Sequence, residues 1–271
     1  MRAAVILVAV TGVLTACTIG PLATRPRPEV WLLMGQSNMS GRGDLAELPA
    51  DALRPDARIL TYGNDRRLDI AREPVDSATG QFDAVSADDL AGVGPGLAFA
   101  RERVNRRRGR RIILVPCAKG GTSVTAWAPN QQATSLYGSC LARAREAMRF
   151  GRVAGALWYQ GETDTASEAL AARWSRNFTE MVVALRSNPG FDSITLLVVG
   201  LGEPPVHGPY AGNYPAWERV RSAQHALAVH NLIVIPAAGL PKMADDLHLS
   251  TPGQLSLGVR LADAAERAVI D

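Results

Sequence analysis

The sequence predicts an α/β protein, a three-layer α/β/α sandwich around a central parallel sheet. Short apolar runs of strand length alternate with segments of helical period through most of the chain. Strands such as Arg111–Pro116 (RIILVP) are expected to be buried, because a parallel sheet has helices on both faces. No internal repeat or second-domain boundary interrupts the alternation, and 271 residues can enclose a full core.

The expected strands are apolar runs, most of them with turn-forming residues nearby. In chain order they are Val30–Met34, Arg58–Tyr62, Arg111–Pro116, Val153–Tyr159, Ser193–Val199 and Leu232–Ile235.

The expected helices have apolar residues at helical spacing. The clearest begins at a capping box, Thr165-Ala166-Ser167-Glu168, and ends at Asn188-Pro189-Gly190. The others are Leu97–Val104 with Pro95 near its first turn, Leu141–Arg149, Pro215–Val229, and a last helix from Thr251-Pro252 to about Val269.

The amino terminus has the pattern of an export signal. Arg2 precedes an apolar stretch that is too short to span a bilayer and that ends in Leu14-Thr15-Ala16-Cys17, similar to a bacterial lipobox. We therefore expect a signal peptide over 1–16, a lipidated Cys17 opening a tether over 17–28, and one domain over 29–271. The protein would then be anchored in the bacterial cell envelope, in the periplasm or on the outer surface. The alternative is an ordinary signal peptide with an incidental cysteine.

The net charge argues against a nucleic-acid partner, and the cysteines leave one disulfide undecided. A net charge of +3 is too small to indicate nucleic-acid binding. The seven arginines within Arg101–Arg111 are expected to form the solvated end of a helix and the turn after it. Cys117 and Cys140 can pair in an oxidising compartment, but the sequence does not decide whether they do.

Ser37 is the candidate nucleophile. It leaves the first buried strand on a turn, within Gly35-Gln36-Ser37-Asn38-Met39, and such a turn exposes a hydroxyl at the carboxyl edge of the sheet. Met39 replaces the second glycine of the Gly-x-Ser-x-Gly elbow, which excludes that motif.

Serine needs a base, and the base needs an orienting acid. His248 is the candidate base, and either Asp245 or Asp246 can be the acid. The remaining histidines, His207, His225 and His230, lack such surroundings and are expected to be structural or exposed.

An oxyanion needs preorganised donors. The expected donors are the backbone N–H of Ser37, a glycine N–H after the Arg111–Pro116 strand, and the side-chain amide of Gln160. Gly121 is preferred to Gly120 for the second donor, although residue type alone does not separate them.

Together these segments resemble the SGNH hydrolase superfamily, and within it the sialate O-acetylesterase and acetylxylan esterase group, carbohydrate esterase family 6. The matching blocks occur in family order over nearly all of the chain after the tether. They are Gly35–Met39, Ala71–Pro74, Gly92–Gly96, Val115–Thr122 (VPCAKGGT), Trp158–Asp164 (WYQGETD) and Asp245–Leu249 (DDLHL). The superfamily generally carries Asn where this chain has Gln160, and Gln is what the carbohydrate esterase group shows.

The resemblance implies a flavodoxin-like SGNH hydrolase fold and favours Asp245 as the acid. Asn38, Gly120 and Glu162 are expected to support the site. The expected activity is removal of O-acetyl groups from carbohydrates through an acetyl-serine intermediate, with no cofactor, no metal and no nucleic-acid partner. The alternatives are a short-chain lipid esterase or thioesterase and a non-catalytic glycan-binding lipoprotein. The particular sugar and the oligomeric state stay open.

Three other features of the chain bear on the site. The segment Asn64–Gly92 has few apolar residues and several turn formers, and we expect an insertion that wraps over the active-site edge. Gly92–Gly96 (GVGPG) superficially resembles a phosphate-binding loop, but it lacks the Gly-Lys-Ser/Thr ending of that motif, so we expect no nucleotide-binding role. Trp127 and Tyr62 are candidate walls for stacking a sugar, against the more common case in which aromatic residues belong to the core.

Overall fold

The computed structural model describes residues 26–268 and has the predicted α/β class. One sheet has the strand order β3-β2-β4-β1-β5-β6-β7, and every neighbouring pair is parallel except β2 and β3. The strands are β1 (Glu29–Gly35), β2 (Ile59–Tyr62), β3 (Leu68–Ile70), β4 (Ile112–Pro116), β5 (Arg152–Tyr159), β6 (Thr195–Gly200) and β7 (Leu232–Pro236).

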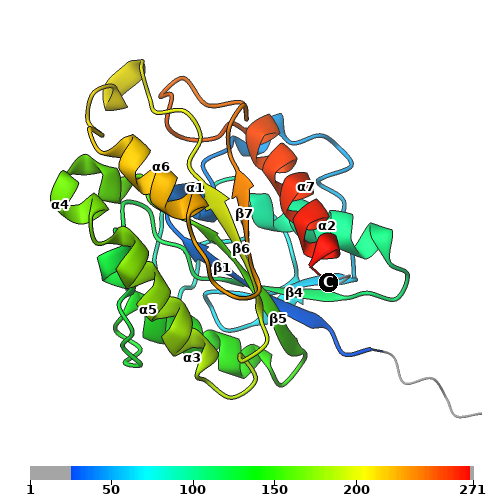
Figure 1. Cartoon of the computed structure of the whole chain (residues 1–271). Helices are drawn as coiled ribbons and strands as arrows, with labels where there is room; N and C mark the ends of the chain where they lie inside the picture. The colour runs from blue at the N-terminus through cyan, green and yellow to red at the C-terminus, as the bar shows by residue number, and fades with distance from the viewer. Residues whose placement is uncertain (1–25, 269–271) are drawn as a thin grey trace, which may run out of the picture.

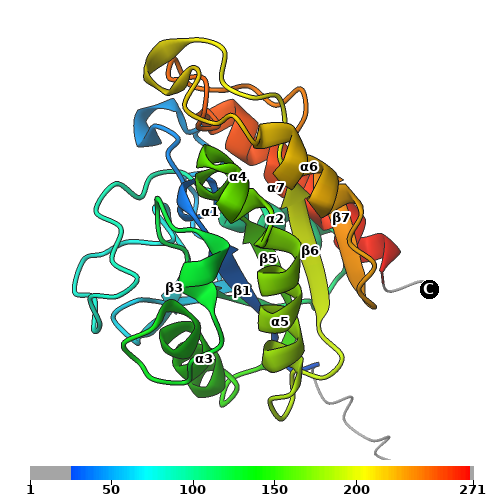
Figure 2. The same cartoon turned by 60° about the vertical axis from the view of Figure 1, so that its left-hand side comes forward.

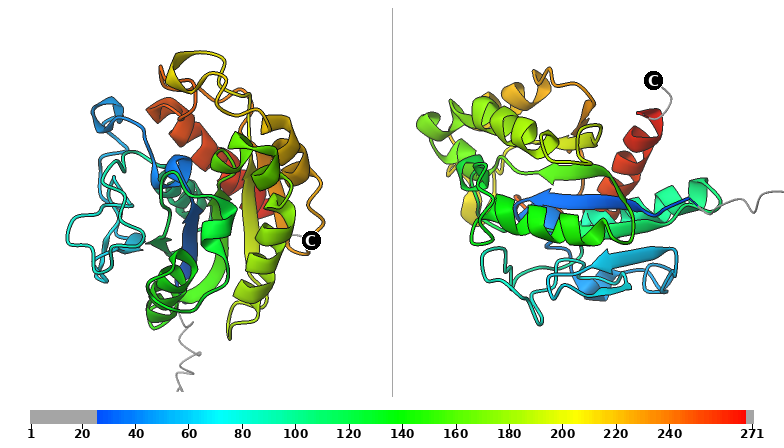
Figure 3. Two further views of the ribbon diagram at one scale, coloured as in Figure 1. Left: turned by 90° about the vertical axis from the view of Figure 1, so that its left-hand side faces the viewer. Right: turned by 90° about the horizontal axis from the view of Figure 1, so that it is seen from below.

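Helices cover both faces of the sheet. They are α1 (Ser37–Ser40), α2 (Pro95–Arg106), α3 (Leu136–Ala147), α4 (Glu168–Ala171), α5 (Trp174–Arg186), α6 (Trp217–His225) and α7 (Thr251–Arg267). Short 3₁₀ turns lie at Leu45–Glu47, Val124–Trp127, Thr163–Ala166 and Gly208–Tyr210. Helices α2 and α7 pack together on one face, and α3, α5 and α6 lie on the other (Figures 1 and 3). This is the expected three-layer sandwich.

The boundaries of several predicted elements were wrong. The proposed capping box does not open a long helix, because Ser167 caps the four-residue α4 by accepting a hydrogen bond from Leu170, and α5 then begins at Trp174. Helix α3 begins at Leu136, where the Ser135 side chain caps it, five residues before the predicted start. Helix α6 ends at His225, four residues before the predicted Val229. The short β3 and α1 were not predicted, since neither has enough residues to show a period.

The arginine-rich segment is not simply a solvated helix end. Arg103 and Arg110 are buried, and both pair with Glu29 at the start of β1 and with Glu266 near the end of α7. The prediction holds for Arg107–Gly109 and Arg111, which are exposed beyond the end of α2. It fails for Arg103 and Arg110, because the sequence does not show that Glu29 and Glu266 converge on them.

The insertion between β2 and α2 is held by a buried arginine. Arg143 of α3 is fully buried and donates to Asn64, to Ser86 at 3.1 Å and to the carbonyl oxygen of Pro116. Asn64 in turn donates to Asp76 at 2.8 Å. Burial raises the pKa of Asp76 to about 7. These bonds fix the insertion against the carboxyl end of β4, beside the expected active-site edge.

Most of the amino-terminal prediction lies outside the described residues. This applies to the signal peptide over 1–16, to Cys17 and to the tether up to residue 25. Among residues 26–268, no helix combines the length and apolar character that crossing a bilayer requires.

Candidate active site

Ser37 lies where β1 ends and the four-residue α1 begins. Gly35 adopts a φ of +126°, and a Cβ there would lie 2.1 Å from the carbonyl oxygen of Tyr159, so glycine is required for the chain to turn so close to β5. The backbone N–H of Gln36 donates to that same carbonyl at 2.8 Å. The Ser37 side chain is therefore held rigidly at the carboxyl edge of the sheet, where it is 5% exposed.

The structure brings Ser37, His248 and Asp245 together in one hydrogen-bonded line. His248 Nε2 is 2.9 Å from Ser37 Oγ, and His248 Nδ1 is 2.7 Å from Asp245 Oδ2. Ser37 and His248 are 211 positions apart in the chain. The line therefore depends on the sheet, which places the end of β1 beside the loop before α7.

Asp245 is fixed by its own loop. Its Oδ1 accepts hydrogen bonds from the backbone N–H groups of Leu247 at 3.0 Å and His248 at 2.9 Å, which leaves Oδ2 for the imidazole. Burial acts to raise the pKa of Asp245, but the hydrogen bonds from His248 and Leu247 outweigh it and hold the pKa below its ordinary value. Asp245 therefore stays ionised at neutral pH beside His248.

Asp246 points away from the imidazole. Its Oδ2 accepts from the backbone N–H groups of Val206 at 2.7 Å and His207 at 3.1 Å, and its Oδ1 pairs with Lys242 at 3.1 Å. The structure thus places Asp245, and not Asp246, beside His248, a choice that the residue types alone left open.

Asn38 connects the two halves of the site. Its side chain donates to Glu162 at 2.8 Å and to the carbonyl oxygen of Leu247 at 3.3 Å, and it accepts from the backbone N–H of Leu249 at 2.9 Å. The last two bonds flank His248. Glu162 is buried, and burial raises its pKa although the bond from Asn38 opposes this. Asn38 and Glu162 therefore position α1 against the loop that carries His248.

Two backbone donors are free near Ser37. The N–H groups of Ser37 and Gly121 donate no hydrogen bond within the described residues. Gly121 is exposed, with a φ of +72°. Gly120, by contrast, donates its N–H to Asp88 at 2.8 Å. Of the two glycines, Gly121 is the one that can offer an N–H to an oxyanion.

Gln160 does not fit the donor role expected from the sequence. Its side chain is fully buried, its amide nitrogen donates to Thr122, Gln36 and Asp164, and its oxygen accepts from Trp174 at 2.9 Å. Every polar atom of the amide already has a partner. Gln160 instead links the β5 turn to the Gly121 turn and to Gln36, the residue before Ser37.

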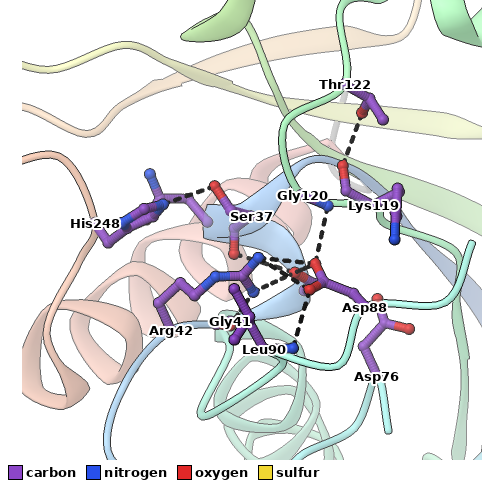
Figure 4. Close-up of polar contacts among 12 residues, drawn as sticks. Ser37, Gly41, Arg42, Asp76, Asp88, Leu90, Lys119, Gly120, Thr122 and His248 are labelled. Atoms are coloured by element: carbon purple, nitrogen blue, oxygen red, sulfur yellow. Dashed lines mark hydrogen bonds and ion pairs between the residues drawn. The ribbon is translucent and has the colours of Figure 1, made fainter. Parts of the chain in front are cut away.

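Asp88 and Arg42 complete the floor of the site, and neither was predicted. Asp88 accepts from Ser40 at 2.8 Å and from Gly120, and both of its carboxylate oxygens accept from Nη2 of Arg42 (Figure 4). Burial opposes ionisation of Asp88, but Arg42 outweighs it and lowers the pKa of that carboxyl. Asp88 belongs to the insertion, so the insertion reaches the active-site edge from beneath Ser37. Only the spatial arrangement reveals this role, because an Asp within a polar segment that has no motif around it carries no sequence signal.

The other residues singled out in the sequence lie in the core, in a disulfide or at the surface. Trp127 and Tyr62 are buried, so they belong to the core, the more common case, and do not form walls for stacking a sugar. Cys117 and Cys140 form a disulfide, which joins the carboxyl end of β4 to α3. His207, His225 and His230 are exposed. Among residues 26–268, no group of three His, Cys, Asp or Glu side chains is arranged to hold a metal ion.

Comparison with known proteins shows the family of this chain. Residues 27–267 match the family described as carbohydrate esterase, sialic acid-specific acetylesterase. A probable carbohydrate esterase of Arabidopsis thaliana is 33% identical over 256 residues, which cover 88% of this chain and 90% of the plant protein. Its X-ray structure superposes with a TM-score of 0.75 at 31% identity, over 89% of this chain and 99% of that one.

Two more distant structures share the fold. The crystal structure of NanS has a TM-score of 0.67 at 18% identity, over 89% of this chain and 98% of that chain. A carbohydrate acetylesterase from Xanthomonas citri has a TM-score of 0.61 at 23% identity, over 89% of this chain and 56% of its own.

Proposed function

The chain belongs to the family of carbohydrate esterases called sialic acid-specific acetylesterases and is a carbohydrate acetylesterase, and we propose that Ser37, His248 and Asp245 perform its reaction as a catalytic triad. The single observation that carries the proposal is the unbroken line of hydrogen bonds, 2.9 Å from Ser37 to His248 and 2.7 Å from His248 to Asp245. Such a line moves a proton from a nucleophile to a base whose orientation is fixed.

In the first half-reaction, Ser37 Oγ attacks the carbonyl carbon of the O-acetyl group as His248 Nε2 takes the hydroxyl proton. The negative charge moves to the carbonyl oxygen, where the N–H groups of Ser37 and Gly121 are free to donate. When this intermediate collapses, the bond between the acetyl carbon and the sugar oxygen breaks. His248 returns its proton to that oxygen, so the sugar leaves as an alcohol and acetyl-Ser37 remains.

In the second half-reaction, His248 removes a proton from water, and the hydroxide attacks the acetyl-Ser37 carbonyl. The Ser37 oxygen then leaves and recovers the proton from His248, and acetic acid is released. Asp245 stays ionised throughout and stabilises the protonated imidazole, in keeping with its lowered pKa.

Acetate release from p-nitrophenyl acetate and from peracetylated xylose tests the mechanism. Ser37→Ala should lower kcat by at least about 10³-fold. Ser187→Ala, an exposed serine at the end of α5, serves as the matched control and should retain parental activity. Equal release by a folded Ser37→Ala protein would refute the triad. Faster turnover of long-chain than of acetyl p-nitrophenyl esters would favour a lipid esterase, and no release by the folded parent would favour a glycan-binding lipoprotein.

We also propose that the mature protein begins at a lipidated Cys17 and resides in the bacterial envelope. The lipobox-like Leu14-Thr15-Ala16-Cys17 supports this. Metabolic labelling with a radioactive fatty acid should mark the parent protein and not the Cys17→Ala variant, and equal labelling of both would contradict the proposal.

A further inference from the structure

We propose that Tyr210 forms the platform on which the sugar of the acetylated substrate stacks. The inference rests on the proposed function, because it concerns which side of the triad the sugar occupies. Tyr210 ends the 3₁₀ turn Gly208–Tyr210, on the connection that runs from β6 to α6.

Tyr210 is the aromatic residue that packs on the catalytic histidine. Its ring centroid lies 5.8 Å from that of His248, with an angle of 83° between the planes. Tyr214 follows at 6.3 Å from Tyr210, and the buried Trp217 lies 5.7 Å beyond Tyr214. Tyr210 and Tyr214 are both partly exposed. The row of rings therefore extends from a buried anchor on α6 to the edge of the triad.

The connection carrying Tyr210 is tied to the loop that carries the triad acid. Asp246 accepts hydrogen bonds from the backbone N–H groups of Val206 and His207, and Lys242 donates to the carbonyl oxygen of Glu203 at 2.9 Å. In Figures 1 and 2 the connection after β6 and the connection after β7 lie side by side above the sheet. Tyr210 is thus held in place before substrate arrives, which lowers the entropic cost of binding a sugar against it.

The position of Gly208 shows how closely the two segments approach. It adopts a φ of +69°, and a Cβ added there would lie 3.2 Å from the carbonyl oxygens of Ala244 and Asp245. Contact at Gly208 brings the next two residues, and so the Tyr210 ring, up to the triad loop.

The chemistry assigns the sugar to this side. In this reaction the sugar is the leaving group, and its oxygen receives a proton from His248 Nε2. The carbon skeleton attached to that oxygen must therefore lie next to the imidazole. The glycine turn that supplies Gly121 lies on the other side of Ser37 from His248, as the position of Gly120 in Figure 4 shows. The acetyl oxygen thus points toward Gly121 and the sugar toward Tyr210.

A partly exposed aromatic ring suits a sugar. One face of a pyranose presents mainly C–H groups, and ligand sites combine such apolar surfaces with a few polar groups that fix orientation. Burial raises the pKa of the neighbouring Tyr214 to about 12, so its hydroxyl stays protonated and neutral over the working range of an esterase.

The test compares two acetyl esters that differ in the leaving group. Acetylated xylose offers a ring to Tyr210, whereas ethyl acetate offers two carbons, and both are followed by acetate release. The measured quantity is the ratio of kcat/KM for acetylated xylose to kcat/KM for ethyl acetate. Tyr210→Ala should lower this ratio by about 3- to 10-fold, mainly through a higher KM for the sugar ester. Tyr210→Phe keeps the ring and should keep the parental ratio.

Two results would overturn the inference. An unchanged ratio in Tyr210→Ala would show that the ring does not contact the sugar. An equal loss on both esters would show that Tyr210 acts by placing His248. Failure of the proposed function looks different, because parent and Ser37→Ala proteins would then release acetate equally.

Discussion

Replacing Asp245 by Asn should inactivate the site, because it should move the imidazole proton of His248 from Nδ1 to Nε2. Oδ1 of Asp245 accepts two backbone N–H bonds, from Leu247 and His248, while Oδ2 faces the imidazole. In Asp245→Asn the amide oxygen must keep the two backbone bonds, so the NH₂ group faces His248 Nδ1. Nδ1 then becomes an acceptor and Nε2 carries the proton, and a protonated Nε2 cannot accept the proton of Ser37.

The magnitude follows from losing the general base while the fold is kept. The two backbone bonds survive, so the melting temperature should change little. The value of kcat for p-nitrophenyl acetate should fall by about 10³- to 10⁴-fold, equivalent to about 4 to 5.5 kcal/mol of activation free energy. Steady-state rates at pH 8 and thermal unfolding measure the two quantities on the same preparation.

Asp246→Asn is the matched control one residue away. Asn tolerates the left-handed φ of +58° at this position, and its amide oxygen can accept from Val206 and His207 as the carboxylate does. We expect kcat within about threefold of the parent, because the change loses only a partly exposed ion pair with Lys242. More than a tenth of parental kcat in Asp245→Asn, or an equal loss in Asp246→Asn, would refute the assignment of Asp245 as the orienting acid.

Three further outcomes are expected. Burial raises the pKa of Glu73 from 4.5 to about 8, so Glu73 ionises at a lower pH in the unfolded chain than in the folded protein. The parent should therefore lose stability as pH rises through this window. Glu73→Gln should escape that loss, and a melting-temperature difference from the parent that does not grow between pH 5 and pH 8 would contradict it. The Cβ of Gly121→Ala would meet no atom within 4 Å, so this change should cost only about 1–2 kcal/mol of folding stability, because of the positive φ. The Cβ of Gly120→Ala would lie 2.4 Å from the Arg42 guanidinium group, which pairs with Asp88, so kcat should fall further in Gly120→Ala than in Gly121→Ala. Equal kcat losses in the two variants would argue against a role of the Arg42–Asp88 pair in the site. Replacing Cys117 and Cys140 by Ala opens a bridge between residues 23 apart and should lower unfolding free energy by about 3 kcal/mol, measured by urea denaturation, with kcat kept; unchanged stability would show that the bridge does not constrain the unfolded chain.

Local patterns predicted the regular elements better than their ends. The buried strands β1, β4 and β5 were located to within about one residue, because apolar runs between turns are a strong local signal. The start of α3 and the break between α4 and α5 were not predicted correctly. Their capping residues, Ser135 and Ser167, have other serines and threonines nearby that could serve as caps equally well. Boundaries depend on which of several local hydrogen bonds the rest of the fold permits.

The sequence by itself determined the class of fold, the candidate nucleophile and base, and the motifs whose resemblance to a family indicates an acetylesterase. Ser37 and His248 carry that information because a serine after a buried strand and an acid–histidine pair are local signals. Only the tertiary structure decided between Asp245 and Asp246 and between Gly120 and Gly121. It also moved Gln160 from the donors to the support of the site and brought Tyr210 to His248. Each of these depends on which hydrogen-bonding groups are already occupied, and occupancy is set by contacts between segments far apart in the chain.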